Sequence, residues 1–487
     1  MWCSSPELDL CLGLIMIILY GLFCLSNKQV HLKDVYFFCA CWPLLLTFGY
    51  LSDAFSLDKA SAFSIGIFSA PGLDLLLCIL TFIILQSFKS FESVLLLMLA
   101  YVGQFFMLHS CDLVSFYVCL EAQNFCFLVL CGLQPKLNAP TASNASNAKG
   151  SAASASASAS ASASASASTM NLASSSGLRY DLSSGSALFS VEASLKFLIL
   201  SAFSSGVILF WFSAIYLRTG MSSLFFKSVS VDFCSQMESF QILLAMMFKL
   251  GAAPLHLWVL DIYGSVKRQL LMYISTAPKL SLFGFWVSSW HQVWSDFSIL
   301  LFVIFTLILG SLSAFSQPAL RALIAYSTVS EMGILLMAVE TAGFHSLFQH
   351  LTIYIVTQLI IWNLSDKRLW IVVALSLAGL PPLSGFFTKA FIFWHVANQQ
   401  HVLLLMVALV CTTIALVYYI RIIRLFWTYP TGQSLRQVGG HRGVCLSSNS
   451  FLYDQSPAVL NTKAGLTSAC LVILFVAPIF ILQPFVL

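Results

Sequence analysis

Apolar stretches of about 20 residues alternate with short polar segments along nearly the whole chain. An α-helix rises 1.5 Å per residue, so a stretch of about 20 apolar residues crosses the hydrocarbon core of a bilayer. Inside a bilayer, helices satisfy their own backbone hydrogen bonds. The pattern therefore predicts an all-α polytopic membrane protein with about 14 transmembrane helices.

Two of the predicted helices contain residues that break helices. In FKLGAAPLHLW these are Gly251 and Pro254, and in LAGLPPLSGFFTK they are Gly379, Pro381 and Pro382. A discontinuous membrane helix exposes backbone carbonyls and partial helix dipoles at mid-depth, which is tolerated where it lines a polar cavity. The two interruptions therefore indicate an ion path.

Longer polar segments divide the chain. Alternating Ala and Ser in SAASASASASASASASAS offers no apolar face to bury, which favours a disordered or weakly ordered linker, with silk-like strand pairing as the alternative. The parts expected are N-terminal helices one to four (1–111), the fifth helix with a channel Glu (112–133), the low-complexity insert (134–185), a transmembrane core of helices six to thirteen (186–427), a second polar loop (428–463) and a C-terminal helix (464–487).

Composition agrees with this interpretation and excludes several kinds of chemistry. The chain is 59% hydrophobic and 9% charged, against about 25% charged in an average soluble domain. Its 14 Cys form no CxxC or Cys/His cluster, and no GxGxxG or GxxxxGK[ST] motif is present. We therefore expect no iron–sulfur, zinc, nucleotide or flavin site, and no cofactor in this chain. The basic residues form no patch for nucleic acid.

The distribution of charge predicts topology. Most Lys and Arg between the spans fall on one side of the membrane, whereas only Lys59, Arg218 and Lys227 fall on the other. The positive-inside rule then places both termini outside and the Ala/Ser insert inside. The start, MWCSSPELDL, lacks the basic residues of a signal peptide or presequence. With 42 Phe and this hydrophobicity, an organelle-encoded inner-membrane protein is expected, with bacterial and thylakoid membranes as alternatives.

Ionisable residues within the spans are candidates for function. A Lys near a helix end can extend its ammonium group to the interface, so depth is decisive. Lys249 lies about 11 residues, roughly 16 Å, from either end of its span, and Lys279 and Glu121 are also central. These positions favour a function over a packing salt bridge. Depth does not decide for Lys196 or Lys389, which lie nearer to helix ends.

Other polar positions form a second tier. His256, two residues after Pro254, can be a proton relay, a polar anchor or a packing residue, and the same alternatives hold for His350 in FHSLFQHLTIY. Glu331, in YSTVSEMG, lies on an apolar helix and is expected to be functional or paired. Its partner cannot be read from the sequence.

Several stretches resemble subunit 2 of respiratory complex I, NADH:ubiquinone oxidoreductase, one of its antiporter-like membrane subunits. They are FYVCLEAQ, VEASLKFLILSAFSSGVILF, FKLGAAPLHLWVLDIY, STAPKL, RALIAYSTVSEMG and LSLAGLPPLSGFFTK. The resemblance covers about residues 112–424 without the insert, whereas the first three helices match only in hydropathy. It implies two inverted five-helix repeats and two discontinuous helices within the fourteen.

The resemblance also implies roles for five charges. Glu121 becomes the carboxylate of the fifth helix and Lys196 the lysine of the sixth that modulates the charge pair. Lys249 and Lys389 become the lysines of the broken seventh and twelfth helices, and Lys279 the connecting lysine of the eighth. NADH, FMN, iron–sulfur clusters and ubiquinone are then expected in other subunits.

The same resemblance implies partners and a location. The partners are other membrane-arm subunits and phospholipids such as cardiolipin. The location is the mitochondrial inner membrane, with the termini in the intermembrane space and the insert in the matrix. The function implied is proton translocation coupled to NADH oxidation and ubiquinone reduction. The alternatives are a subunit of a multisubunit cation/proton antiporter, and a structural subunit whose lysines only form packing salt bridges.

Two departures from the family pattern stand out. After Asp261 the chain reads GSVKRQ from Gly264 to Gln269, where the family usually has Glu-Gly and a Pro-Thr-Pro-like turn. A role of the missing Glu is thus absent or moved, with Asp261 as a candidate. Glu331 stands where relatives commonly carry His, which reverses the available charge.

Overall fold

The computed structural model describes residues 13–20, 70–88, 90–110, 112–132, 182–220, 222, 236–290, 296–363 and 367–428. Much of the first predicted helix, all of the second, nearly all of the Ala/Ser insert, the second polar loop and the C-terminal helix lie outside these residues. The predicted total of about fourteen helices therefore cannot be counted within the described part.

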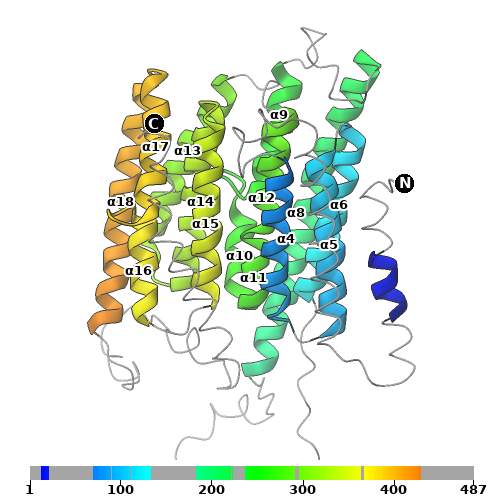
Figure 1. The fold of residues 1–487 in the computed structure, drawn as a ribbon, viewed down its shortest axis with the longest axis horizontal. Helices are drawn as coiled ribbons and strands as arrows, with labels where there is room; N and C mark the ends of the chain where they lie inside the picture. The colour runs from blue at the N-terminus through cyan, green and yellow to red at the C-terminus, as the bar shows by residue number, and fades with distance from the viewer. Residues whose placement is uncertain are drawn as a thin grey trace, which may run out of the picture.

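The described residues form a bundle of roughly parallel helices (Figure 1). In chain order its elements are α4 (Ala70–Leu85), α5 (Phe91–His109), α6 (Leu113–Gly132), α8 (Leu182–Thr219), α9 (Gln236–Leu250), α10 (Leu257–Ser265), α11 (Arg268–Ile274), α12 (Ala277–Phe285), the π-helix η3 (Trp286–Trp290), α13 (Asp296–Ser316), α14 (Leu320–Glu340), α15 (Phe344–Asn363), α16 (Lys367–Ala378), α17 (Ser384–Asn398) and α18 (Val402–Thr428).

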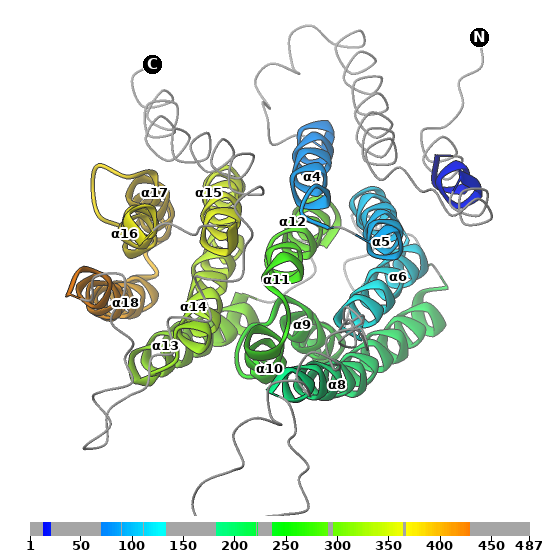
Figure 2. The ribbon, with the colours of Figure 1, turned by 90° about the horizontal axis from the view of Figure 1, so that it is seen from below.

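The helices are arranged in two groups. Figure 2, viewed along the bundle, shows α4 to α10 on one side and α13 to α18 on the other, with α11 and α12 between them. Eight helical segments of the described part are long and apolar enough to cross a membrane. Exposed apolar side chains cover the outer helices α8 and α18, among them Ile199, Phe203 and Leu403. This distribution suits a protein surrounded by lipid or by neighbouring subunits.

The predicted interruption at Gly251 is confirmed. The backbone of Gly251 has a φ of +74°, a left-handed conformation that glycine adopts without steric cost. The N–H of Gly251 donates to the Phe248 carbonyl at 3.0 Å, and the N–H of Ala252 donates to the Met247 carbonyl at 2.9 Å. These two bonds form a Schellman cap, which ends α9 in the middle of the bundle.

The predicted interruption at Gly379 is also confirmed and has the same local structure. Gly379 has a φ of +75°. Its N–H donates to the Ser376 carbonyl at 3.0 Å, and the Leu380 N–H donates to the Leu375 carbonyl at 3.2 Å. The sequence thus ends α16 with the same glycine cap that ends α9, and in each case a second half-helix follows.

A third division was not predicted. The eighth predicted helix is split into α11 and α12 at Ser275 and Thr276, both fully buried. Pro278, in the first turn of α12, has no N–H to continue the ladder. The Thr276 hydroxyl instead donates to the Met272 carbonyl at 2.7 Å. The regular helix hydrogen bonding is therefore interrupted just before Lys279.

Two arginines hold together the helix ends on one side of the bundle. At this end, which we call the basic end, Arg321 donates to the carbonyls of Gly264, in the last turn of α10, and of Val266, just after it. Arg421 donates to the Phe315 carbonyl at the end of α13. The other end, which we call the opposite end, contains the end of α5 and the start of α6. The loop assignment made from the sequence also places Arg321 and Arg421 on the same side of the membrane.

Candidate functional site

The first charged pair of the site joins α6 to α9. Lys249 Nζ lies 3.6 Å from Glu121 Oε1, and the side chain of Lys249 is 4% exposed. Asn124, one turn further along α6, donates to the same carboxylate oxygen at 3.3 Å. The Lys249 ammonium group also donates to the backbone carbonyl and the hydroxyl of Ser201 on α8, at 3.2 and 3.0 Å. Lys249 is therefore held between three helices.

The helix break supplies part of the surroundings of Lys249. This lysine is in the last turn of α9, where the final carbonyls of a helix have no partner within the helix. The indole N–H of Trp258, on the second half-helix α10, donates to the Phe248 carbonyl at 2.9 Å. One half-helix thus caps the other beside the buried charge.

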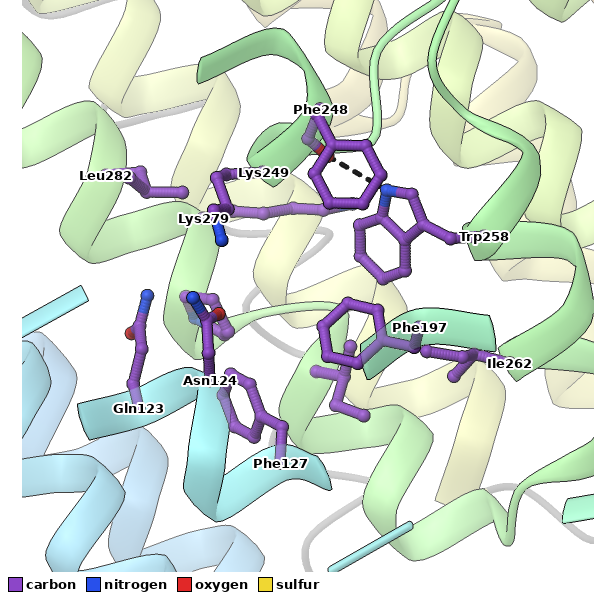
Figure 3. Close-up of a pocket in the computed structure, with 12 residues that line it drawn as sticks. Gln123, Asn124, Phe127, Phe197, Phe248, Lys249, Trp258, Ile262, Lys279 and Leu282 are labelled. Atoms are coloured by element: carbon purple, nitrogen blue, oxygen red, sulfur yellow. Dashed lines mark hydrogen bonds between the residues drawn. The ribbon is translucent and has the colours of Figure 1, made fainter. Parts of the chain in front are cut away.

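A small cavity separates Lys249 from Lys279. It provides about 30 Å³ for the centres of water molecules, enough for about two of them. Figure 3 shows Gln123 and Asn124 rising from α6 toward Lys249 and Lys279, with aromatic side chains closing the other side. The aromatic and apolar lining is Phe127, Phe197, Phe248, Trp258, Ile262, Ile274, Pro278 and Leu282. The cavity therefore has two lysines facing two amide side chains, with aromatic and apolar groups around them.

Lys279 connects this cavity to α15. Its ammonium group donates to the Tyr354 hydroxyl at 2.7 Å and lies 4.9 Å from the centre of the Tyr354 ring. Among the described residues, no carboxylate lies within ion-pair distance of Lys279. The hydroxyl and the ring face of Tyr354 therefore stabilise this buried ammonium group, together with any water in the cavity.

A second charge cluster surrounds the other helix break. Lys389 Nζ lies 2.7 Å from Glu331 Oε1 and donates to the Leu377 carbonyl, in the last turn of α16, at 2.7 Å. His350 Nε2 lies 3.0 Å from Glu331 Oε2, and His350 Nδ1 lies 3.1 Å from the Thr388 hydroxyl. All of these side chains are buried. Glu331 thus has two partners that the sequence did not reveal.

The two halves of the site meet on α15. Tyr354, the partner of Lys279, and His350, the partner of Glu331, are four residues apart and hence on the same face of that helix. The Tyr354 hydroxyl also interacts electrostatically with Glu331. The structure therefore contains one line of buried or partly buried polar groups, which we call the charge line: Glu121, Lys249, Lys279, Tyr354, His350, Glu331 and Lys389.

Some predicted residues lie outside the charge line. Lys196 is half-exposed, 2.9 Å from Glu192 and 3.9 Å from Asp261, and both acids are also half-exposed. The candidate Asp261 therefore contacts Lys196 rather than the buried groups. His256, at the start of α10, is buried with its ring 5.7 Å from that of Tyr326. Its Nδ1 has no hydrogen-bond partner among the described residues.

Sequence reasoning also missed participants. Gln123 and Asn124 follow Glu121 in CLEAQNF and would have been visible as polar residues inside an apolar span. Thr388 directly precedes Lys389. Tyr354 could not be singled out from the sequence. A tyrosine in an apolar helix usually serves in packing, and only the structure shows that a buried lysine faces this one.

Comparisons with known proteins show which family the chain resembles. Residues 182–367 match the family described as NADH:quinone oxidoreductase/Mrp antiporter, TM. The chain is similar to NADH-ubiquinone oxidoreductase chain 2 of Chlamydomonas reinhardtii, at 47% identity over 99% of this chain and 100% of that protein.

Solved structures share the fold. One described as respiratory complex I from Thermus thermophilus with bound aureothin contains a chain with a TM-score of 0.71 and 17% identity, covering 98% of both chains. One described as the Mrp complex from Dietzia sp. DQ12-45-1b gives a TM-score of 0.64 at 16% identity, covering 98% of this chain and 94% of that one.

Proposed function

Because this chain belongs to the family of NADH-ubiquinone oxidoreductase chain 2, we propose that it carries protons through the membrane arm of respiratory complex I along the charge line. The observation that carries the proposal is the succession of these polar pairs, joined by the cavity and by α15, past both helix breaks. NADH oxidation and ubiquinone reduction take place in other subunits and reach this one as a change of conformation or charge.

The pair Glu121–Lys249 is suited to load and release a proton. An ammonium group held against a carboxylate in a low-dielectric interior keeps its proton, and the same group without that partner releases it more readily. At a separation near 4 Å, two unit charges interact by about 4 kcal/mol at an effective dielectric constant of 20. Moving one charge against 100 mV requires about 2.3 kcal/mol. Separating the 3.6 Å pair is therefore energetically sufficient to drive transfer.

The rest of the charge line supplies a route from Lys249. Lys279 would give a proton to the Tyr354 hydroxyl and take one from water in the cavity between Lys249 and Lys279. The Tyr354 hydroxyl both donates and accepts, so it can take up a proton on one side and release one on the other. The imidazole of His350 can do the same between Thr388 and Glu331. The route ends at the pair of Glu331 and Lys389.

The two interruptions support the proposal of inverted repeats. Each break has a glycine cap and a last-turn carbonyl that accepts from the following half-helix, through Trp258 in one case and Lys389 in the other. However, α9 enters from the opposite end and α16 from the basic end. We propose that the two units are related by reversal in the membrane, within a total of about fourteen helices.

Orientation follows from charge. The protein is a multi-pass membrane protein, and we propose that the basic end faces the mitochondrial matrix and the opposite end the intermembrane space. In this orientation the Ala/Ser insert, which precedes α8, starts from the matrix side. Other membrane-arm subunits and phospholipids such as cardiolipin would cover the exposed apolar faces of α8 and α18.

A substitution of Lys249 tests the proposal. In assembled complex I reconstituted in vesicles, Lys249→Ala should lower the number of protons pumped per NADH oxidised, whereas Lys267→Ala, at the basic end outside the charge line, should not. Normal pumping by an assembled Lys249→Ala complex would instead support a structural role. Cation/proton exchange by the complex without NADH would support the antiporter alternative.

A further inference from the structure

A second group of polar side chains is buried in the N-terminal part of the bundle, away from the charge line. Its members come from α4, α5 and α11, and we call them the polar column: Asp74, Cys78, Tyr101, Gln104, His109 and Tyr273. None belongs to the charges considered above. The helices that carry them pack against one another and against α12, the helix of Lys279.

One end of the polar column reaches the opposite end of the bundle. His109, the last residue of α5, has Nε2 2.9 Å from Asp74 Oδ2 on α4. The Asp74 side chain is 2% exposed and that of His109 is 26% exposed. The pair thus places a buried carboxylate under a partly accessible imidazole. The second oxygen of Asp74 has no hydrogen-bond partner among the described residues.

The column continues inward along α5. Tyr101, Phe105 and His109 are spaced by four residues and share a face of that helix, over about 12 Å of its length. The Tyr101 hydroxyl lies beside the Cys78 thiol and interacts electrostatically with Asp74.

Deeper in the bundle, the Tyr273 hydroxyl donates to Gln104 Oε1 at 3.0 Å. Gln104 and Tyr273 are fully buried. The polar groups thus extend from the end of the bundle to its middle.

The inner end of the column adjoins the cavity of the charge line. Helices α5 and α6 approach closely at Gly103, where an added Cβ would lie 3.6 Å from the backbone nitrogen of Gln123. Gln123 lines the cavity, and Phe127, another lining residue, contacts the Tyr273 ring edge-on at 5.5 Å between ring centres. Gln104 Nε2 is a donor, and Gln123 Oε1 an acceptor, that lack partners within the described part of the chain.

We propose that the polar column is a branch of the proton route that connects the cavity between Lys249 and Lys279 to the opposite end of the bundle, with water between Gln104 and Gln123 and with the Asp74–His109 pair as its terminus. Buried donors and acceptors without partners are costly, and a water molecule that bridges two of them removes the cost.

The chemistry of the side chains suits this role. Carboxylate, imidazole and phenol groups each exchange a proton with a neighbouring water, whereas amide groups hold and orient water without changing charge. Asp74 and His109 are therefore the exchanging groups at the outlet, and Gln104 and Gln123 are the groups that position water at the junction. The proposal rests on the proposed function of the charge line.

Proton pumping by assembled variant complexes tests the branch. In reconstituted complex I, Asp74→Asn and Gln104→Leu should each lower proton pumping per NADH oxidised severalfold. Ser93→Ala, which removes a buried hydroxyl at the other end of α5, is the matched control and should pump normally. If Lys249→Ala loses pumping while Asp74→Asn and Gln104→Leu keep it, the branch is overturned and the charge line stands. If all three pump normally, the proposed function itself fails.

A density map of the unsubstituted complex tests the proposed branch even if a variant does not assemble. A cryo-electron microscopy map that resolves ordered water should show water bridging Gln104 Nε2 and Gln123 Oε1, and further water beside Tyr101 and the unpaired oxygen of Asp74. Direct contact between the two glutamine side chains, or a dry apolar plug at that junction, would overturn the branch.

Discussion

The carboxylate of Glu331 on α14 accepts a hydrogen bond from the ammonium group of Lys389 on α17 at 2.7 Å. The two residues are 58 positions apart in the sequence, and each is buried. Ion pairs in such surroundings stabilise each partner against a large desolvation penalty, so neither charge is tolerated well without the other. Glu331 thus completes the charge line at the second break.

Replacing Glu331 should expose this dependence. Glu331→Gln leaves Lys389 buried without its countercharge, and breaking a buried pair from one side costs about 3–5 kcal/mol. We expect less assembled complex and a lower melting temperature in a thermal-shift measurement. Glu92→Gln, on the exposed side of the first turn of α5, is the control and should melt like the unsubstituted complex. Equal melting of both variants would contradict the pairing.

The Tyr354 hydroxyl should matter more than its ring. Tyr354→Phe keeps the aromatic face over Lys279 but removes the acceptor at 2.7 Å, and an unsatisfied buried charged donor costs about 1–3 kcal/mol or more. We predict an assembled complex with slower proton pumping, measured in vesicles with a pH-sensitive dye. Tyr216→Phe, on the exposed face of α8, should pump normally. Normal pumping by Tyr354→Phe would remove this hydroxyl from the route.

Substitution of Lys196 should distinguish an effect on stability from an effect on pumping. Its contacts with Glu192 and Asp261 are at the surface, where ion pairs contribute little. Lys196→Ala should therefore leave the melting temperature of the assembled complex nearly unchanged. Loss of pumping without loss of stability in this variant would support the modulating role that the family resemblance implies. A large drop in melting temperature would show that the surface pair is structural.

The glycines at the helix breaks should be hard to replace. Gly251→Ala forces a Cβ onto a left-handed backbone and places it 2.6 Å from Val259 Cγ2, whereas at Gly379 the nearest atom, Lys389 Cδ, lies 3.5 Å away. Strain of this kind costs about 1–3 kcal/mol per site. We expect Gly251→Ala to lower the melting temperature more than Gly379→Ala.

A third glycine provides the matched control. Gly264 is helical in α10, and an added Cβ there meets no other atom within 4 Å. Gly264→Ala should be neutral or stabilising by about 0.5–1 kcal/mol. Destabilisation by Gly264→Ala equal to that of Gly251→Ala would show that the conformation at the break is not the cause.

The sequence by itself determined the class of protein, the two helix breaks and the depth of the central charges. Membrane spans are local in sequence, because each helix satisfies its own backbone and must be apolar for about 20 residues. The helix ends at the two breaks are also encoded locally, since a left-handed cap depends on a single glycine. Depth alone was therefore enough to single out Glu121, Lys249 and Lys279.

Tertiary structure decided which of these charges meet. The partners of Glu331, the phenol that receives Lys279 and the hydrogen bond between Tyr273 and Gln104 all depend on how helices distant in the sequence pack. The depth of a residue within its predicted span did not distinguish Lys196 from Lys389. Packing, however, buries Lys389 against Glu331 and leaves Lys196 half-exposed beside Glu192. Helix rotation and neighbour choice set these contacts, and an apolar sequence specifies neither, because lipid and protein interior favour the same residues.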